Sequence, residues 1–202
     1  SFRQRFLIAD EVGLGKTIEA GLVIKEMIYR HNYGRILIVC PASLLYQWQN
    51  EMESKFNEKF TIMDRRLLGR ACAGNGGGNP WLVHNKVICS LDFIKNRNFE
   101  EDLSRTHWDA VIFDEAHRLR RDSSAATIAY NAAEVISART RSLILLSATP
   151  FRGKLEELYY LIALLDKNIL GPFQTFYNEY CLDCSDLSAL KRKLDQVVIR
   201  RT

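Results

Sequence analysis

Residues 10–21, DEVGLGKTIEAG, follow a short apolar run and precede a segment with helical periodicity. Gly13 and Gly15 let the backbone approach phosphate oxygens without side-chain bulk, and the following helix offers free N–H groups and the positive end of its dipole. In such a loop Lys16 reaches the β and γ phosphates, and the Thr17 hydroxyl binds magnesium. The predicted phosphate-binding residues are Val12, Gly13, Leu14, Gly15, Lys16 and Thr17.

Apolar runs of strand length alternate with helical segments along the chain. The expected strands are residues 6–9, 36–40, 60–63, 87–90, 110–113 and 143–147. Their near-continuous apolarity is typical of strands covered on both faces, and the alternation with helices implies right-handed crossovers and a parallel sheet. We therefore expect one three-layer α/β domain with a mainly parallel central sheet over residues 1–153. After about Lys154 the strands stop, and residues 154–202 are expected to form a helical C-terminal extension.

Two helices are indicated by the spacing of their apolar residues. The apolar face of one carries Ala20, Ile24, Met27 and Ile28, and that of the other carries Leu155, Leu158, Tyr159 and Ile162. Residues 31–34 are expected to end the first helix, and Ser43, which comes after Pro41, is a candidate helix cap.

Composition limits the class of protein further. The chain has 202 residues, of which 47% are hydrophobic, enough for one large or two small domains with a well-formed core. No run of 18 apolar residues is present and the first residues lack the pattern of a signal peptide, so we expect no membrane partner. The five cysteines are expected to be reduced thiols. The net charge of +4 permits a polyanionic partner without requiring one.

The sequence AVIFDEAH, residues 110–117, places two carboxylates directly after an apolar strand. A phosphate loop that hydrolyses its ligand needs a metal ligand and a group that activates water, both at the end of a neighbouring parallel strand. Asp114 would hold magnesium through the second coordination shell of the ion, and Glu115 would act as general base toward the attacking water. The alternative is a strand that simply ends in an acidic turn.

A third segment with polar residues, LLSATP at residues 145–150, lies at the C-terminal end of an apolar strand. Its small hydroxyl residues are placed to hydrogen-bond the acidic motif and to sense the γ-phosphate. Taken alone, a polar strand exit explains the segment equally well. The order of phosphate loop, acidic pair and SATP strengthens the functional interpretation.

DEVGLGKT, DEAH and SATP, in this order, resemble the first RecA-like lobe of superfamily-two helicase-type ATPases. ILIVCPASLLYQWQNEM, which contains Trp48, DEAHRLRRDSS, SATPFRGKLEELYYLIALLDKNILG and VIRRT are similar to segments of the Swi/Snf-type branch. The resemblance covers nearly the whole chain. Within this branch, IEAG, VICSLDF and SATP look closest to the RapA or HepA group of bacterial RNA-polymerase-associated ATPases.

This resemblance implies a P-loop ATPase that uses ATP and magnesium to translocate along double-stranded DNA, usually without separating its strands. Lys16 and Thr17 would bind the triphosphate and magnesium, and Asp114 and Glu115 would carry out hydrolysis. The residues implied to couple nucleotide state to the grip on nucleic acid are His117, Ser147 and Thr149. A prokaryotic, cytoplasmic and nucleoid-associated protein is expected, and RNA polymerase or another DNA-bound complex is a candidate partner.

Four residues fall in segments that touch the phosphate backbone in the family: Pro41, Ala42, Ser43 and Ser90. Such contacts position a protein on nucleic acid without reading its sequence, which suits a motor. For Ser43 a helix cap, and for Ser90 a strand-end hydroxyl, are equally good explanations. Two other functions remain open for the chain, a strand-separating DNA or RNA helicase and a nucleotide-dependent docking module for RNA polymerase.

The chain departs from the family pattern at several places. Asp10 stands where many phosphate loops have Gly or Ala, and Arg120 and Arg121 stand where Lys-Asn is more usual. Gln4 lies too close to the loop to be the usual adenine-recognising glutamine. The chain reaches Thr202 without the second RecA-like lobe and its arginine fingers. The loss of such an arginine lowers the rate of phosphoryl transfer roughly 10³–10⁵-fold. We therefore expect this chain to bind ATP weakly and to hydrolyse it negligibly.

Other conspicuous residues are expected to be structural. The lone CxxC of Cys181 and Cys184 has no second ligand pair, and Trp81 and Trp108 are expected in the core. The aromatic residues expected to form the core face of the extension are Phe173, Phe176, Tyr177 and Tyr180. Residues 73–80 are expected to form a mobile surface loop because of their glycine content. For Arg118, Arg120 and Arg121, a basic patch and a solvated turn both remain open.

Overall fold

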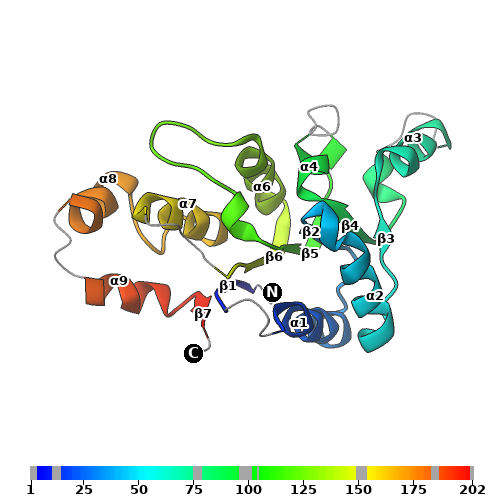
Figure 1. Cartoon of the computed structure of the whole chain (residues 1–202), viewed down its shortest axis with the longest axis horizontal. Helices are drawn as coiled ribbons and strands as arrows, with labels where there is room; N and C mark the ends of the chain where they lie inside the picture. Colours follow the sequence, from blue (N-terminus) through cyan, green and yellow to red (C-terminus); the bar gives the residue numbers. More distant parts are fainter. Residues whose placement is uncertain are drawn as a thin grey trace.

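The central feature of the chain is one seven-stranded sheet with helices on both faces (Figure 1). The computed structural model describes residues 4–10, 15–74, 79–95, 102–103, 105–148, 154–182 and 187–200. The strands are β1 (Arg5–Ile8), β2 (Ile36–Cys40), β3 (Thr61–Ile62), β4 (Lys86–Ser90), β5 (Trp108–Phe113), β6 (Thr140–Leu146) and β7 (Val198–Ile199). They lie in the order β3-β4-β2-β5-β6-β1-β7, and every pair of neighbours is parallel. The predicted parallel sheet of an α/β domain is confirmed.

Helices connect successive strands, as the sequence pattern predicts. The α-helices are α1 (Lys16–His31), α2 (Leu45–Phe56), α3 (Arg65–Gly74), α4 (Leu91–Ile94), α6 (Ile128–Ala138), α7 (Leu155–Leu165), α8 (Phe173–Phe176) and α9 (Leu187–Leu194). The shorter helical segments are η1 (Ala42–Leu44), η2 (Pro80–Leu82), η4 (Ala116–Arg118) and the π-helical η5 (Tyr177–Leu182). The two expected apolar faces are confirmed, because α1 buries Ala20, Ile24 and Met27, and α7 buries Leu158, Tyr159 and Ile162.

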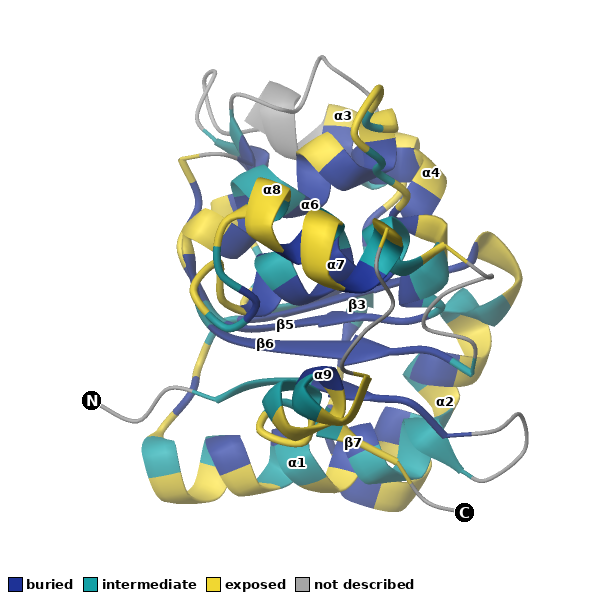
Figure 2. Ribbon diagram, turned by 90° about the vertical axis from the view of Figure 1, so that its left-hand side faces the viewer, coloured by how far each residue is buried: buried dark blue, intermediate teal, exposed yellow. Residues whose placement is uncertain are grey.

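Two apolar clusters fill the space on either side of the sheet, so the three expected layers are present (Figure 2). One cluster joins α1 and α2 to one face of the strands. At Gly21 of α1 these helices approach so closely that an added Cβ would lie 2.2 Å from the Phe56 ring of α2. A larger residue at position 21 would therefore force the two helices apart.

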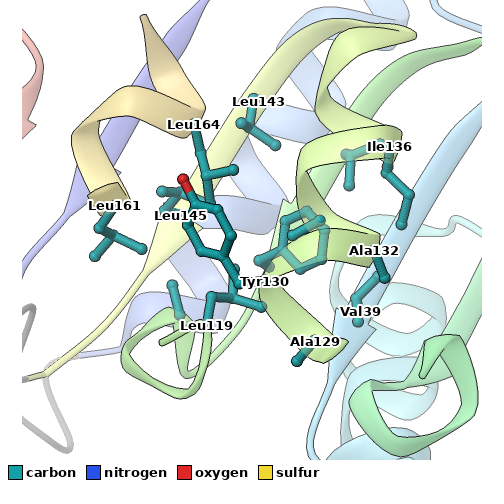
Figure 3. Packing of buried hydrophobic residues seen from close by; sticks show 14 of the residues in the cluster. Val39, Leu119, Ala129, Tyr130, Ala132, Ile136, Leu143, Leu145, Leu161 and Leu164 are labelled. Atoms are coloured by element: carbon teal, nitrogen blue, oxygen red, sulfur yellow. The ribbon is translucent and has the colours of Figure 1, made fainter. Parts of the chain in front are cut away.

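The second cluster lies between the other sheet face and α3, α4, α6 and α7. Figure 3 shows side chains of this cluster, among them Leu143 and Leu145 of β6, Ile136 of α6, and Leu161 and Leu164 of α7. The helices of the expected extension thus contribute to the same core as the sheet. The expected domain boundary between residues 153 and 154 stays a prediction.

The expectation that strands stop after about Lys154 is wrong. Val198–Ile199 forms β7, which pairs in parallel with β1 at the edge of the sheet. The N–H groups of Leu7 and Ala9 donate to the carbonyls of Val197 and Ile199, both at 2.8 Å. A strand of two residues gives too short an apolar run to be recognised from periodicity.

Several smaller expectations can be compared with the described residues. Trp81 and Trp108 are fully buried, as predicted. Of the four aromatic residues expected on the core face of the extension, Phe176 and Tyr180 are buried, whereas Phe173 and Tyr177 are partly exposed.

The expected loop of residues 73–80 is only partly described. Helix α3 extends through Gly74 and η2 begins at Pro80, and residues 75–78 lie outside the described ranges. Cys184 also lies outside them. No helix within the described part of the chain is both long and apolar enough to cross a membrane.

Candidate nucleotide site

Three neighbouring strands bring the sequence motifs together at one edge of the sheet. β5, β6 and β1 are adjacent and parallel, so their carboxyl ends face the same side. The acidic motif follows β5, SATP follows β6 and the phosphate loop follows β1. Crevices outside the carboxyl ends of parallel strands are where ligands bind in open α/β sheets. The topology therefore unites segments that lie far apart in the sequence.

The described part of the phosphate loop has the backbone geometry expected at the start of a helix. Gly15 adopts φ 80° and ψ 31°, a left-handed conformation that glycine reaches without steric cost, and α1 begins directly after it at Lys16. The N–H groups of Ile18 and Glu19 donate to the Gly15 carbonyl, at 2.8 and 3.1 Å. The N-terminus of the 16-residue helix α1, which begins with Lys16 and Thr17, therefore follows the predicted phosphate loop directly. The predicted residues Val12, Gly13 and Leu14 lie outside the described residues.

Lys16 lies close to both the loop and the acidic motif. Its ammonium group donates to the carbonyl of Asp10 at 3.0 Å, and the Asp10 side chain is fully buried. Burial raises the pKa of Asp114, and the positive charge of Lys16 opposes this rise. The structure therefore brings together the predicted phosphate-binding lysine and the predicted metal-binding carboxylate.

Asp114 is the first residue after β5, and both of its carboxylate oxygens accept a hydrogen bond. The Trp48 indole Nε1 donates to Oδ2 at 2.9 Å, and the backbone N–H of Glu115 donates to Oδ1 at 2.8 Å. Burial raises the pKa of Asp114, and the hydrogen bonds from Trp48 and Glu115 oppose this effect. A nearby cation would favour the ionised form. The carboxylate is thus suited to a metal ion.

The donor set fits magnesium bound together with a nucleotide. Among the described residues there is no group of three or more His, Cys, Asp or Glu side chains that would enclose an ion by themselves. Magnesium is usually held by one or two carboxylates together with substrate phosphates and water. The hydroxyl of Thr17 and the carboxylate of Asp114 would hold the ion, and nucleotide phosphates would supply further ligands.

Glu115 adopts a strained backbone conformation. Its φ of 51° and ψ of 46° are left-handed, which costs a residue other than glycine about 1–3 kcal/mol and is often found at functional sites. Its Oε2 lies 3.0 Å from Nδ1 of His117. The side chain is partly exposed at the edge of the site, unlike that of Asp114.

His117 also approaches the SATP segment. Its Nδ1 lies 3.4 Å from Oγ of Ser147, and the buried Ser147 donates its N–H to the Ile8 carbonyl of β1 at 3.0 Å. A protonated Nδ1 donates, whereas a bare Nδ1 accepts. It can therefore donate to Glu115 or accept from Ser147, but cannot do both at once. Thr149, the third predicted coupling residue, lies outside the described residues.

The predicted nucleic-acid contacts follow two other neighbouring strands. Pro41, Ala42 and Ser43 come after β2, and Ser90 ends β4, where it is paired in register with Cys40. Ser90 caps α4 by accepting the N–H of Phe93 at 3.0 Å. The expected cap at Ser43 is wrong, since this residue lies inside η1 and the cap positions of η1 and α2 are Pro41 and Leu44. Its side chain is exposed instead.

The role of Trp48 was not predicted from the sequence, although its segment was recognised. Trp48 belongs to the buried face of α2 with Met52 and Phe56, spacing that indicates only packing. Its partner Asp114 lies 66 residues further along the chain. The polar N–H of a tryptophan on an apolar helix face was the single available signal, because buried indole groups usually find a partner.

The amino-acid sequence of the chain is similar to those of known bacterial proteins. The chain is 38% identical to RNA polymerase-associated protein RapA of Proteus mirabilis and 39% identical to that of Cronobacter sakazakii, over 176 residues that make up 87% of this chain. It spans 18% of the length of each of these relatives.

Solved structures share the fold. The Sulfolobus solfataricus SWI2/SNF2 ATPase core in complex with dsDNA has a TM-score of 0.78 and 18% identity, covering 98% of this chain and 40% of that chain. A second structure of this core domain has a TM-score of 0.74 and 20% identity, covering 98% of this chain and 39% of that chain. The RecA-like, Swi/Snf-type fold expected from the motifs is confirmed. Because residues 3–202 match the SNF2-related domain, the chain belongs to the SNF2-related domain family.

Proposed function

We propose that this chain is the ATP-binding lobe of a DNA-dependent ATPase that translocates on duplex DNA and remodels protein–nucleic acid complexes. The carrying observation is the junction of β1, β5 and β6, whose parallel ends bring Lys16, Asp114 and Ser147 to one edge. Family membership supports an ATP hydrolase. ATP is the proposed nucleotide and magnesium the proposed metal.

In the proposed reaction, Lys16 neutralises charge on the β and γ phosphates, and the N-terminus of α1 adds its backbone donors. Thr17 and Asp114 would hold magnesium, and the ion would supply positive charge that balances the charge developing on the phosphates. The oxygen of a water molecule forms a bond to the γ-phosphorus while the bond to the ADP oxygen breaks. Glu115 accepts the proton that the water loses. The partial exposure of Glu115 allows water to reach it.

Coupling of ATP state to nucleic acid is assigned to His117, Ser147 and Thr149. The two alternative partners of His117 Nδ1 support this assignment, because a shift between Glu115 and Ser147 links the catalytic loop to the segment after β6. Two discrete arrangements of one group are the usual basis of such coupling.

The phosphate backbone of duplex DNA is assigned to Pro41, Ala42, Ser43 and Ser90. They lie at the carboxyl ends of β2 and β4, on the same sheet edge as the nucleotide site. The solved SWI2/SNF2 core in complex with dsDNA supports duplex DNA as the nucleic acid. A net charge of +4 is compatible with this partner.

The resemblance to RapA favours RNA polymerase, or another DNA-bound complex, as the object that is remodelled, and a cytoplasmic, nucleoid-associated location. A second RecA-like lobe in the full-length protein would complete the ATP site. A strand-separating helicase and a docking module that does not hydrolyse ATP are the alternatives.

The test uses the full-length protein and measures ATP hydrolysis with and without duplex DNA. We expect DNA to stimulate hydrolysis and Lys16→Ala to abolish it. Displacement of a triplex-forming strand without separation of the duplex would support translocation. Efficient duplex separation would favour the helicase, and unstimulated, negligible hydrolysis would favour the docking module.

A further inference from the structure

The three tryptophans of the chain are all buried, but their indole N–H groups differ. Trp48, Trp81 and Trp108 expose at most 1% of their surface. Within the described residues, Nε1 of Trp81 and Nε1 of Trp108 have no hydrogen-bond partner. Nε1 of Trp48 donates to Oδ2 of Asp114 at 2.9 Å. Trp81 and Trp108 lie in one apolar cluster and Trp48 in the other, so burial in this protein does not by itself require the indole N–H to be satisfied. The hydrogen bond of Trp48 is therefore a specific feature.

The position of Trp48 is fixed by the helix that carries it. Trp48, Met52 and Phe56 follow one another at intervals of four residues on the buried face of α2, within the apolar cluster that includes α1. The indole ring is thus held by packing, and its N–H has little freedom to turn away from Asp114. A donor held in this way fixes the orientation of the carboxylate that accepts its bond.

The hydrogen bonds leave room for a metal ion on the carboxylate. Oδ2 of Asp114 accepts from Trp48, and Oδ1 accepts from the Glu115 N–H. Each carboxylate oxygen has about two lone pairs, so each keeps one for another partner. The two donors come from separate segments, α2 and the loop after β5, and together they restrain rotation of the carboxylate group.

We propose that Trp48 is a positioning residue for the metal, whose indole N–H orients the Asp114 carboxylate toward nucleotide-bound magnesium. This inference rests on the proposed function, because it assumes that Asp114 holds the metal. Groups that hydrogen-bond a metal ligand commonly change metal affinity by about 10–100-fold when they are removed. Trp48 does not touch the nucleotide in this scheme and acts only through Asp114.

The experiment compares Trp48→Phe with Trp81→Phe and Trp108→Phe. Each variant removes a buried indole, but only Trp48→Phe removes a hydrogen bond to a carboxylate. Binding of Mn²⁺ in the presence of ADP is measured by electron paramagnetic resonance, and metal-free binding of a fluorescent ADP is measured in EDTA. We expect Trp48→Phe to weaken Mn²⁺ binding about 10-fold or more, with metal-free nucleotide binding unchanged. The two control variants should leave both affinities unchanged.

A second measurement needs no variant at position 48. The wild-type chain labelled with ¹⁵N-tryptophan gives three indole N–H signals, which Trp81→Phe and Trp108→Phe assign by removing one each. Addition of Mg²⁺ with ADP should shift the Trp48 signal saturably and leave the other two in place. Thermal unfolding of each variant shows whether it is folded.

The outcomes separate this inference from the proposed function. Two results would overturn the role of Trp48 alone. One is metal-dependent ADP binding that is equal in wild type and Trp48→Phe, and the other is a Trp48 indole signal that does not shift at saturating Mg²⁺. Loss of metal-free and metal-bound affinity in the same proportion shows a purely structural role and also overturns it. A wild-type chain that binds no metal with nucleotide overturns both proposals.

Discussion

The guanidinium group of Arg121 lies over the Tyr160 ring, with 4.7 Å between its central carbon and the ring centroid. Arg121 comes from the segment after the acidic motif, and Tyr160 comes from α7. The same guanidinium lies 5.4 Å from the Tyr130 ring centroid of α6, and its Nη1 is 3.6 Å from Oε2 of Glu134. The contact therefore fastens the segment that follows the catalytic carboxylates to both helices. Arg118 and Arg120 are exposed by comparison.

Replacing Arg121 should destabilise the protein. Arg121→Ala loses two cation–π contacts, each about 0.5–1 kcal/mol at a partly exposed site. We expect a decrease of about 1–2 kcal/mol in the free energy of unfolding, measured with urea. Arg120→Ala is the matched control, and as an exposed substitution it should change stability by less than about 0.5 kcal/mol. Equal effects of the two variants would show that the stacking contributes nothing.

Glu115→Gln should separate nucleotide binding from hydrolysis. The amide keeps the shape of the side chain but accepts no proton from water, so the full-length protein should hydrolyse ATP about 10²–10⁴-fold more slowly. ATP affinity should be retained, because Lys16 and the α1 N-terminus remain. Turnover is measured by phosphate release and affinity with a fluorescent ATP analogue. Near-normal turnover would exclude Glu115 as the general base.

Ser147→Ala should weaken the stimulation of hydrolysis by DNA without affecting ATP affinity. It removes the hydroxyl 3.4 Å from His117 Nδ1 and leaves the contact of this nitrogen with Glu115 in place. A coupling free energy of about 1–3 kcal/mol corresponds to a loss of roughly 5–150-fold in stimulation.

Ser142→Ala is the control for this experiment, on the strand that precedes Ser147. Ser142 is equally buried, and its hydroxyl bonds Tyr33 and the N–H of Gln4 at the other end of β6. The Ser142→Ala variant should lower the free energy of unfolding but preserve the stimulation of ATP hydrolysis by DNA. A similar loss of stimulation in both variants would indicate a general effect of weakening the strand.

Glu58 lies away from the nucleotide site, and its carboxylate should make the free energy of unfolding depend on pH. Its carboxylate is bonded by Lys25 of α1 at 2.5 Å and by Lys86 of β4. Burial raises the pKa of Glu58, but the two lysines outweigh this and the net pKa is lowered. A lowered pKa means that the stabilisation is present above the unfolded-state pKa near 4.3 and is lost as pH falls below it toward the folded-state value.

Glu58→Gln should therefore lower the free energy of unfolding by about 1–2 kcal/mol at pH 7. The difference from wild type should shrink below about pH 4, where Glu58 of the wild type becomes protonated. Urea unfolding between neutral and acidic pH measures both. A difference that is independent of pH would mean that the glutamine is destabilising for reasons of packing.

The 202-residue chain alone should hydrolyse ATP negligibly even with duplex DNA. The resemblance implies that a second lobe supplies arginines to the γ-phosphate, and an absent arginine lowers turnover by roughly 10³–10⁵. Turnover by this chain is compared with that of the full-length protein under the same DNA concentration. Rates of the same order would contradict the proposed need for a second lobe.

The sequence predicted the strands and motifs that local patterns can specify. Runs such as residues 36–40 and 110–113 are apolar throughout and became β2 and β5 with little change in their limits. The features that could not be predicted from the sequence depend on contacts between residues far apart in the chain. β7 has two residues and exists because β1 offers it a partner, and the bond from Trp48 to Asp114 joins separate elements. The misassigned cap at Ser43 reflects a turn, η1, that replaced the first turn of the expected helix.

The pairing of β7 with β1 also has a mechanical consequence. Tension applied at Arg200 along the axis of β7 loads the two hydrogen bonds at Leu7 and Ala9 together in shear, because β7 is parallel to β1. The loaded strand, β1, ends at Ile8, shortly before Asp10, whose carbonyl accepts a hydrogen bond from the Lys16 ammonium. A pull on the C-terminal end of this chain is therefore delivered to the strand that carries the phosphate loop.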